Sequence, residues 1–294
     1  MFLQFELWKD CNHGCAFCFN QHIKPVRDKL ASLLYTQRAI QDVPLRKRID
    51  SLSLIGGEFF RLTDQIIALM KEDRVGRSMI CASLMYENPD DWHEYLDRYE
   101  SAGLSSRLLV CTSWDTWGRF DYSPATRLLW ERNVLELHRR LPDAMLHVEM
   151  ILTQDLINRV LDGRISIKNF EDAWACRVDF NTPYLPFYSH YPDKAAFDKD
   201  HQGFFPKRRD FFRFLQYCHE NGEGHLDSML SCKNHSTVLH YTLDDKIWII
   251  LPERHSIGHT CTNLQNCQNN CCGYLDSPIR MHDDVRKFLE NIVN

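Results

Sequence analysis

Strand-like and helix-like patterns alternate through the first 180 residues, and this alternation constrains the fold more than any other feature of the sequence. Short apolar segments are followed by stretches in which apolar residues recur every three or four positions, as in 62–70 and 130–141. Strands separated by helices predict an α/β fold with a parallel sheet and right-handed crossovers. The six expected strands are residues 2–8, 51–55, 78–85, 108–112, 145–152 and 176–180.

The composition is typical of a globular chain. Its 294 residues suffice for one sizeable core, and 44% of them are hydrophobic. The net charge of −5 gives no reason to expect a strongly basic face for nucleic acid. No apolar stretch is long enough to cross a bilayer, and the first residues lack the pattern of a signal peptide. We therefore expect a cytoplasmic protein with no membrane association.

Twelve cysteines are many for a reducing compartment, where clustered cysteines indicate metal or redox chemistry more often than disulfides. Cys11, Cys15 and Cys18 directly follow the first expected strand. Three thiolates can bind three irons of a [4Fe–4S] cluster and leave the fourth iron open to a substrate or cofactor. Because the loop follows a strand, the cluster would lie at the C-terminal edge of the parallel sheet. The alternative is a zinc site that His13 completes.

The Cys-x3-Cys-x2-Cys spacing, with Phe17 just before the third cysteine, resembles the signature of the radical S-adenosylmethionine (SAM) superfamily. The resemblance implies a partial (β/α)6 TIM-like barrel whose cysteine loop, Phe17 included, binds the cluster and SAM. It also implies an electron donor such as a flavodoxin or ferredoxin. SAM would be cleaved to methionine and a 5′-deoxyadenosyl radical that abstracts a substrate hydrogen, while the protein orients the cofactor and excludes water.

Gly56, Gly57 and Glu58 end the second expected strand. Two glycines allow the backbone to approach a ligand closely, and the carboxylate beside them can accept hydrogen bonds from an ammonium group. The segment resembles the Gly-Gly-Glu motif of the radical SAM family, which holds the amino group of SAM. The alternative is an ordinary turn.

The ends of the fourth and fifth expected strands carry further candidates for SAM binding. Ser113 and Asp115 resemble the Ser-x-Asp segment of the radical SAM enzymes with SPASM or twitch extensions, where it contacts the ribose and carboxylate of SAM. An arginine often follows there, and Arg119 is preferred over Arg127. Glu149, on the fifth strand, is expected to point toward SAM. The alternatives are a helix N-cap for Ser113 or Asp115 and a solvated or core-paired glutamate.

A second group of cysteines lies near the C-terminus, after a hairpin expected at 238–251 with Asp244 and Asp245 at its turn. Its spacing resembles part of the SPASM/twitch pattern, which implies one auxiliary [4Fe–4S] cluster. A structural zinc site, with His255 or His259, is the alternative. We expect a radical SAM core domain at 1–222 and a small cysteine-rich domain at 223–294. The candidate ligands are Cys232, Cys261, Cys267 and Cys271, with Cys272 competing for the last place.

Three functional hypotheses follow. The SPASM/twitch-like tail favours modification of a peptide or protein side chain, with the aromatic segment 181–205 near the substrate. The basic and aromatic segment 207–213 is compatible with a nucleotide, RNA or small metabolite as substrate instead. The third hypothesis is a non-catalytic, metal-stabilised binding module. Cys81, Cys111, Cys176 and Cys218 are expected to be small buried apolar residues, although Cys176 or Cys218 would be chemically able to quench a substrate radical.

Overall fold

The structure is a computed structural model that describes residues 2–11, 13, 15, 25–43, 48–58, 63–116, 124–181, 206–224, 238–241 and 247–250. Its strands are β1 (Phe2–Glu6), β2 (Ile49–Ile55), β3 (Val75–Cys81), β4 (Leu108–Trp114), β5 (Met145–Ile151), β6 (Cys176–Asn181), β7 (Val238–Tyr241) and β8 (Ile247–Ile250). Its helices are α1 (Lys29–Asp42), α2 (Thr63–Met70), α3 (Pro89–Ser101), the short 3-10 helix η3 (Ser105–Arg107), α4 (Pro124–Arg140), α5 (Gln154–Leu161), α6 (Ile167–Trp174) and α8 (Arg208–Asn221).

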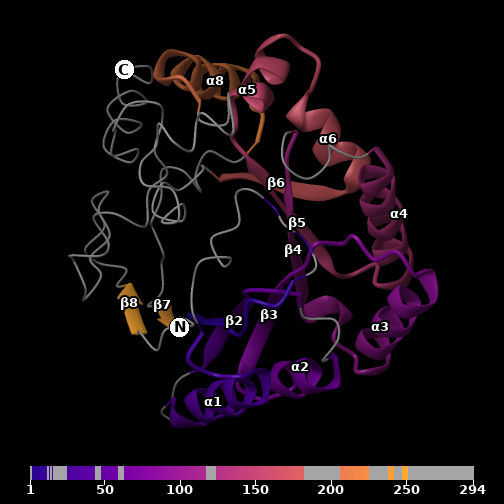
Figure 1. The fold of residues 1–294 in the computed structure, drawn as a ribbon, viewed down its shortest axis with the longest axis vertical. Helices are drawn as coiled ribbons and strands as arrows, with labels where there is room; N and C mark the ends of the chain where they lie inside the picture. The colour runs from indigo at the N-terminus through magenta and orange to yellow at the C-terminus, as the bar shows by residue number, and fades with distance from the viewer. Residues whose placement is uncertain are drawn as a thin grey trace.

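Strands β1 to β6 form a parallel sheet in which each strand pairs with the next one in the sequence. Helices follow the strands and lie along the outer side of the curved sheet (Figure 1). The described strands run in an open order from β6 at one edge to β8 at the other, so they form a partial barrel. The α/β fold class expected from the sequence is therefore confirmed.

The expected hairpin is present as β7 and β8, which pair antiparallel. β7 also pairs parallel with β1, from Phe2 opposite Val238 to Phe5 opposite Tyr241. The hairpin thus extends the barrel sheet beyond β1 and satisfies backbone groups that an edge strand would expose. The expected turn at Asp244 and Asp245 lies outside the described residues.

The two faces of the sheet differ in polarity, because side chains alternate along each strand. The indole of Trp130 in α4 donates a hydrogen bond of 3.4 Å to Thr112 Oγ1, so the face with Thr112 is the one that the helices cover. That outer face is apolar and buried: Leu3, Phe5, Leu52, Leu54, Ile80, Val110, Val148, Met150 and Val178. Polar residues dominate the inner face: Gln4, Ser53, Ser113, His147, Glu149, Arg177 and Asp179. A parallel sheet packed on both faces is apolar throughout, so this inner face suits a polar ligand.

The third strand differs from its expected position. β3 begins three residues earlier than the expected strand and ends at Cys81. Residues 82–85 are buried but leave the sheet, and Leu84 has a left-handed backbone with φ of 55°. An apolar run that is buried without pairing has the same sequence pattern as a strand.

None of the helices in the described part of the chain combines the length and apolar character that a bilayer crossing requires.

Candidate functional site

The cysteine loop begins where β1 ends, and backbone pairing continues past both β1 and β2. The amide of Leu7 donates to the carbonyl of Ile55 at 3.0 Å, and the amide of Glu58 donates to the carbonyl of Asp10 at 2.9 Å. Between them, the amide of Gly57 donates to the carbonyl of Trp8. Residues 7–10 therefore run beside residues 55–58, and the pairing ends one residue before Cys11.

Gly56 and Gly57 are required by this pairing. A Cβ atom at Gly56 would lie 2.4 Å from the carbonyl oxygen of Trp8, and one at Gly57 would lie 2.2 Å from the carbonyl oxygen of Asp10. Gly56 also has φ of +134°, which other residues rarely adopt. In the described residues the glycines allow a close approach to the chain's own backbone, whereas the approach to a ligand that the sequence suggests stays a prediction.

The carboxylate of Glu58 is held by two residues that follow β3. Ser83 donates to Oε2 through its hydroxyl at 2.8 Å and through its amide at 3.3 Å. The hydroxyl of Tyr86 donates to Oε1. Burial, together with the adjacent Glu58 charge, raises the pKa of Tyr86 well above its ordinary value, so the phenol keeps its proton and remains a donor.

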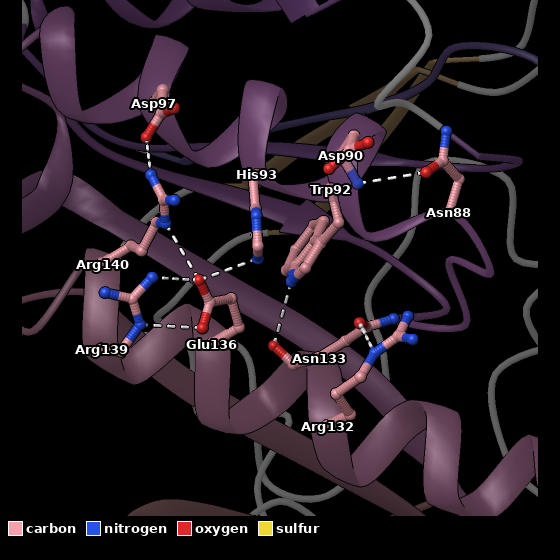
Figure 2. Close-up of polar contacts among 10 residues, drawn as sticks. All are labelled: Asn88, Asp90, Trp92, His93, Asp97, Arg132, Asn133, Glu136, Arg139 and Arg140. Atoms are coloured by element: carbon pink, nitrogen blue, oxygen red, sulfur yellow. Dashed lines mark hydrogen bonds and ion pairs between the residues drawn. The ribbon is translucent and has the colours of Figure 1, made fainter.

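Tyr86 is itself positioned by helices α3 and α4. Its ring stacks on Trp92 with centroids 4.8 Å apart. The buried amide of Asn133 donates to the carbonyls of Leu84 and Tyr86, at 3.0 Å in each case. The indole of Trp92 in turn donates to the carbonyl of Asn133 (Figure 2). Sequence reasoning missed Ser83 and Tyr86; the available signal was that both follow a strand at the edge where the cysteine loop lies.

The described cysteines of the loop, Cys11 and Cys15, carry thiol groups, which are suited to binding iron. Cys11 is exposed, whereas Cys15 is 6% exposed. Both follow the strand whose end is paired with the Glu58 segment, so the donor set fits an iron–sulfur cluster at this edge. Cys18 and Phe17 lie outside the described residues, and within the described part no three His, Cys, Asp or Glu side chains are grouped to hold a metal ion.

The ends of β4 and β5 bring together two of the other candidates. Ser113 lies in register with Glu149 on the inner face. Asp115 follows β4 and is fully buried. α4 begins at Pro124, so neither Ser113 nor Asp115 is its N-cap. Arg127 lies on α4, where its guanidinium pairs with Glu131 at 3.1 Å. Arg119, the preferred arginine, is outside the described residues.

Cys81 and Cys111 are directly paired neighbours on β3 and β4. The sequence predicts separate apolar residues and does not predict this pairing. A hydrogen bond to Cys81, burial and the nearby Glu149 raise the pKa of the Cys111 thiol well above its ordinary value. Cys111 is therefore a protonated thiol, and both cysteines lie on the polar inner face. The prediction of a small buried residue is confirmed for Cys218, which is 1% exposed in the core.

A charged group on β5 and β6 was also missed. His147 contacts Asp179 as an ion pair, and Arg177 reaches the other carboxylate oxygen at 3.3 Å. Burial opposes ionisation of Asp179, but the contacts with His147 and Arg177 outweigh it and lower the pKa of the carboxyl group. All three residues belong to the inner face, so this part of the barrel can receive a polar or charged group. The alternation of side chains along a strand could have indicated this group in the sequence. His147, Glu149 and Asp179 lie on the same face of their strands as Ser113.

Comparison with known proteins agrees with this architecture. Residues 4–92 match the family model of 4Fe–4S single cluster domains, a range that contains the cysteine loop, Glu58, Ser83 and Tyr86. No curated protein sequence is significantly similar to the chain.

Solved structures extend the comparison over the whole chain. Native anSMEcpe with bound AdoMet is similar at 13% identity and a TM-score of 0.60, over 99% of this chain and 96% of that chain. The histidine-tagged form with bound AdoMet gives the same values. Native anSMEcpe with bound AdoMet and Cp18Cys peptide gives a TM-score of 0.58 at the same identity and coverage. The chain therefore shares the overall fold of these AdoMet-bound structures, a partial α/β barrel.

Several expectations from the sequence fall on residues that the structure does not describe. They include the aromatic segment 181–205, apart from Asn181, and the auxiliary-cluster candidates Cys232, Cys261, Cys267, Cys271 and Cys272. The choice between zinc and iron–sulfur at the C-terminal cysteines therefore stays a prediction, as does the domain boundary at 222.

Proposed function

We propose that this protein is a radical SAM enzyme in which Cys11, Cys15 and Cys18 hold a [4Fe–4S] cluster and Glu58 binds the amino group of SAM. The proposal depends on the backbone pairing of residues 7–10 with 55–58, which puts the cysteine loop and the Glu58 carboxylate at one edge of the sheet. The match of residues 4–92 and the fold support it. When bound, the cluster supplies the electron that cleaves SAM to methionine and a 5′-deoxyadenosyl radical.

The chain's own residues would orient SAM. Ser83 and Tyr86 fix the position of the Glu58 carboxylate, so that it would meet an ammonium group without further ordering of its side chain. Residues at the ends of β4 and β5, and in the loops nearby, would contact the ribose and carboxylate of SAM. These residues are Phe17, Ser113, Asp115, Arg119 and Glu149.

Anaerobic incubation of the reconstituted protein with SAM and dithionite tests the proposal. We expect 5′-deoxyadenosine to form, and we expect Cys15→Ala to abolish it because one ligand of the cluster is lost. Cys176→Ala is the matched control, since that thiol lies at the start of β6, away from the cysteine loop. Zinc in the N-terminal loop, or no 5′-deoxyadenosine from the wild type, would instead support a metal-stabilised binding module.

The proposed substrate is a peptide or protein side chain. A similar structure contains a peptide beside AdoMet, and the inner face offers charged residues such as Arg177 and Asp179 to a polar chain. A peptide library incubated with the enzyme, SAM and dithionite should yield products with altered mass, in amounts that match the 5′-deoxyadenosine formed. Product masses changed only in nucleotide or metabolite pools would refute the peptide substrate.

The basic and aromatic segment 207–213 was the argument for a nucleotide, RNA or small metabolite as substrate, and the structure weakens it. In this segment, Phe211 is fully buried and Phe212 is partly buried against the core, which leaves little aromatic surface to stack on bases. Arg209 and Arg213 are exposed and lie near Asp210. This favours a solvated helix face over an RNA-binding patch. Copurified nucleic acid, or salt-dependent RNA binding, would reverse that preference.

We also propose one auxiliary [4Fe–4S] cluster at Cys232, Cys261, Cys267 and Cys271, with Cys272 as the competing ligand. Two clusters require about eight irons per chain, whereas one cluster requires about four. Iron, sulfide and zinc analysis of the reconstituted protein measures this. About four irons with stoichiometric zinc would rule out the auxiliary cluster.

A further inference from the structure

Two thiols lie side by side on the inner face of the barrel. Cys81 and Cys111 are paired across β3 and β4, and the thiol of Cys111 is hydrogen-bonded to Cys81 and to Glu149. We call Cys81 and Cys111 the thiol pair. Cys111 is 2% exposed, whereas Cys81 is only partly buried. Cys81 is therefore the member of the pair that a molecule inside the barrel can reach.

The thiol pair lies between the two groups of residues that are proposed to bind SAM. On one side, Cys81 is followed two positions later by Ser83, which holds the carboxylate of Glu58. On the other side, Cys111 contacts Glu149, a proposed neighbour of the SAM ribose. Glu58 is assigned to the amino group of SAM, and the ribose carries the 5′ carbon. A radical at the 5′ carbon, or one formed on a substrate beside it, would therefore be generated next to these thiols.

The two thiols that the sequence offers as radical quenchers face away from the barrel interior. Cys176 precedes the inner-face residue Arg177 on β6, so it shares the outer face with Val178. Cys218 of α8 is 1% exposed and lies in the apolar core. Neither can meet a radical beside SAM, whereas the thiol pair can.

A protonated thiol is suited to ending a radical reaction. Its S–H bond is weaker than most C–H bonds, including those of 5′-deoxyadenosine, so a carbon radical takes a hydrogen atom from it. An ionised thiol has no hydrogen atom to give. The hydrogen bond to Cys81, burial and the nearby Glu149 hold the pKa of Cys111 well above its ordinary value, so Cys111 keeps its S–H hydrogen.

We propose that the thiol pair donates a hydrogen atom to the carbon radical formed beside SAM, with Cys81 making the contact. The inference rests on the proposed function and adds how the reaction ends. The S–H bond breaks, a C–H bond forms, and a thiyl radical remains on the sulfur. That radical takes one electron from the one-electron reductant that drives SAM cleavage and one proton from solvent, which restores the thiol. The product thus gains one hydrogen atom that comes from solvent.

Heavy water makes the donated hydrogen visible. Thiol hydrogens exchange with solvent, whereas carbon-bound hydrogens do not, and the O–H bonds of water are too strong to give a hydrogen atom. In D2O with SAM and dithionite, and without substrate or added thiols, the 5′-deoxyadenosyl radical is itself the radical to be quenched. We expect 5′-deoxyadenosine that carries one deuterium.

Variants of the full-length reconstituted protein locate the donor. In Cys81→Ala, the deuterated fraction of 5′-deoxyadenosine should fall about tenfold, because the contacting thiol is lost. In Cys111→Ala it should fall less, since Cys81 remains. Iron per chain and SAM affinity should stay within about twofold of wild type in both variants. Cys176→Ala is the control and should keep the full label, because that thiol is on the outer face.

Alkylation gives a second measurement that does not depend on turnover. N-ethylmaleimide is added to the wild-type reconstituted protein without reductant, and the modified cysteines are identified by peptide mass mapping. Bound SAM should slow the modification of Cys81 about tenfold, because the ligand covers this thiol. Cys176 is also only partly buried, so it is a matched control whose rate SAM should leave unchanged.

The other outcomes would overturn the inference. Unlabelled 5′-deoxyadenosine from the wild type would show that the radical takes its hydrogen from carbon. A full label in Cys81→Ala/Cys111→Ala would assign the donor elsewhere, and loss of iron or SAM affinity together with the label would give the pair a structural role. Alkylation of Cys81 at the same rate with and without SAM would place Cys81 away from the ligand. Failure of the wild type to form 5′-deoxyadenosine would refute the proposed function itself, and alkylation would then decide the position of Cys81 alone.

Discussion

At the residue scale, Gly57 shows how one missing side chain positions the site. Its φ is not in the left-handed region, so its requirement is steric: a Cβ would lie 2.2 Å from the carbonyl oxygen of Asp10. We expect Gly57→Ala to lower the free energy of unfolding by about 2–3 kcal/mol, because the two backbones must separate. The shift would move Asp10 and the adjoining Cys11, so iron per chain after reconstitution should fall as well.

Gly103 provides the comparison for Gly57. It has φ of +68°, and a Cβ there would meet nothing within 4 Å. Gly103→Ala should therefore cost about 1 kcal/mol of backbone strain and leave the iron content unchanged. Chemical denaturation and iron analysis of both variants measure these effects. A Gly57→Ala protein with wild-type stability and full iron would show that the two segments are not held as tightly as the distances imply.

Tyr86 is a positioning residue, because it acts on SAM through Glu58. Its raised pKa keeps the phenol protonated, so the donor persists at neutral and alkaline pH. Tyr86→Phe removes one hydrogen bond to a charged acceptor, and we expect SAM to bind about tenfold more weakly. Calorimetry on the anaerobic reconstituted protein measures this affinity. Tyr217→Phe, on α8, removes a hydroxyl away from Glu58 and should leave the affinity unchanged; equal losses in both variants would contradict the assigned role.

At the element scale, Glu136 joins α3 to α4. Its carboxylate accepts from Arg139 at 2.9 Å and from Arg140 at 3.0 Å, and it pairs with His93 of α3 at 2.9 Å (Figure 2). Arg140 also pairs with Asp97 of α3. The hydrogen bond from Arg139 is the main cause that lowers the pKa of Glu136 to about 2; burial opposes the shift and Arg140 adds to it. These helices also hold Tyr86, so their packing bears on the site.

The lowered pKa predicts a pH-dependent contribution to stability. A carboxyl whose folded pKa lies below its ordinary 4.5 contributes its full stabilisation above pH 4.5 and loses it as the pH falls toward 2. We expect Glu136→Gln to destabilise the protein by about 1 kcal/mol at pH 7, because the exposed arginine partners are screened by solvent. The difference from wild type, measured by denaturation at several pH values, should vanish near pH 2.

Glu131→Gln is the control for this pH dependence. Glu131 pairs with Arg127 within α4 and bridges no other helix in the described contacts. Its loss should cost at most about 0.5 kcal/mol. A pH profile of Glu136→Gln that parallels wild type would show that the network contributes no net stability.

The elements that the sequence predicts well are those whose pattern is local. Long helices such as α4 show several turns of apolar period, and the Gly-Gly-Glu segment directly follows a strand. α5 and α6 were not individually expected, although α2, which also has eight residues, was expected from its apolar period. The contacts of Glu58 with Ser83 and Tyr86 join residues 25 and 28 positions apart. Such contacts depend on strand order, which a periodic pattern does not contain.

At the scale of the whole molecule, the polarity of the inner face follows from topology as much as from composition. Ser113, Glu149 and Asp179 come from three successive parallel strands and share one face because they are in register. The sequence supplied Ser113 and Glu149 as separate candidates, whereas the charged group of His147, Arg177 and Asp179 emerged only from the pairing. The cysteine loop of the site could therefore be predicted from the sequence, whereas the residues on β5 and β6 were harder to predict.

The pairing of β7 with β1 makes the domain division expected at 222 testable. In a chain ending at residue 224, β1 would keep β2 but lose β7, and it would expose unpaired backbone groups on that side along Phe2 to Phe5. We expect that chain to aggregate, or to melt several degrees below full length, since each lost kcal/mol lowers the melting temperature by about 2–4 °C in a chain of this size. A chain ending at residue 250 keeps the hairpin and should melt higher than the shorter one. Size-exclusion chromatography and thermal melts compare the three chains, and a monomeric 1–224 chain with the full-length melting temperature would establish 1–222 as an independent domain.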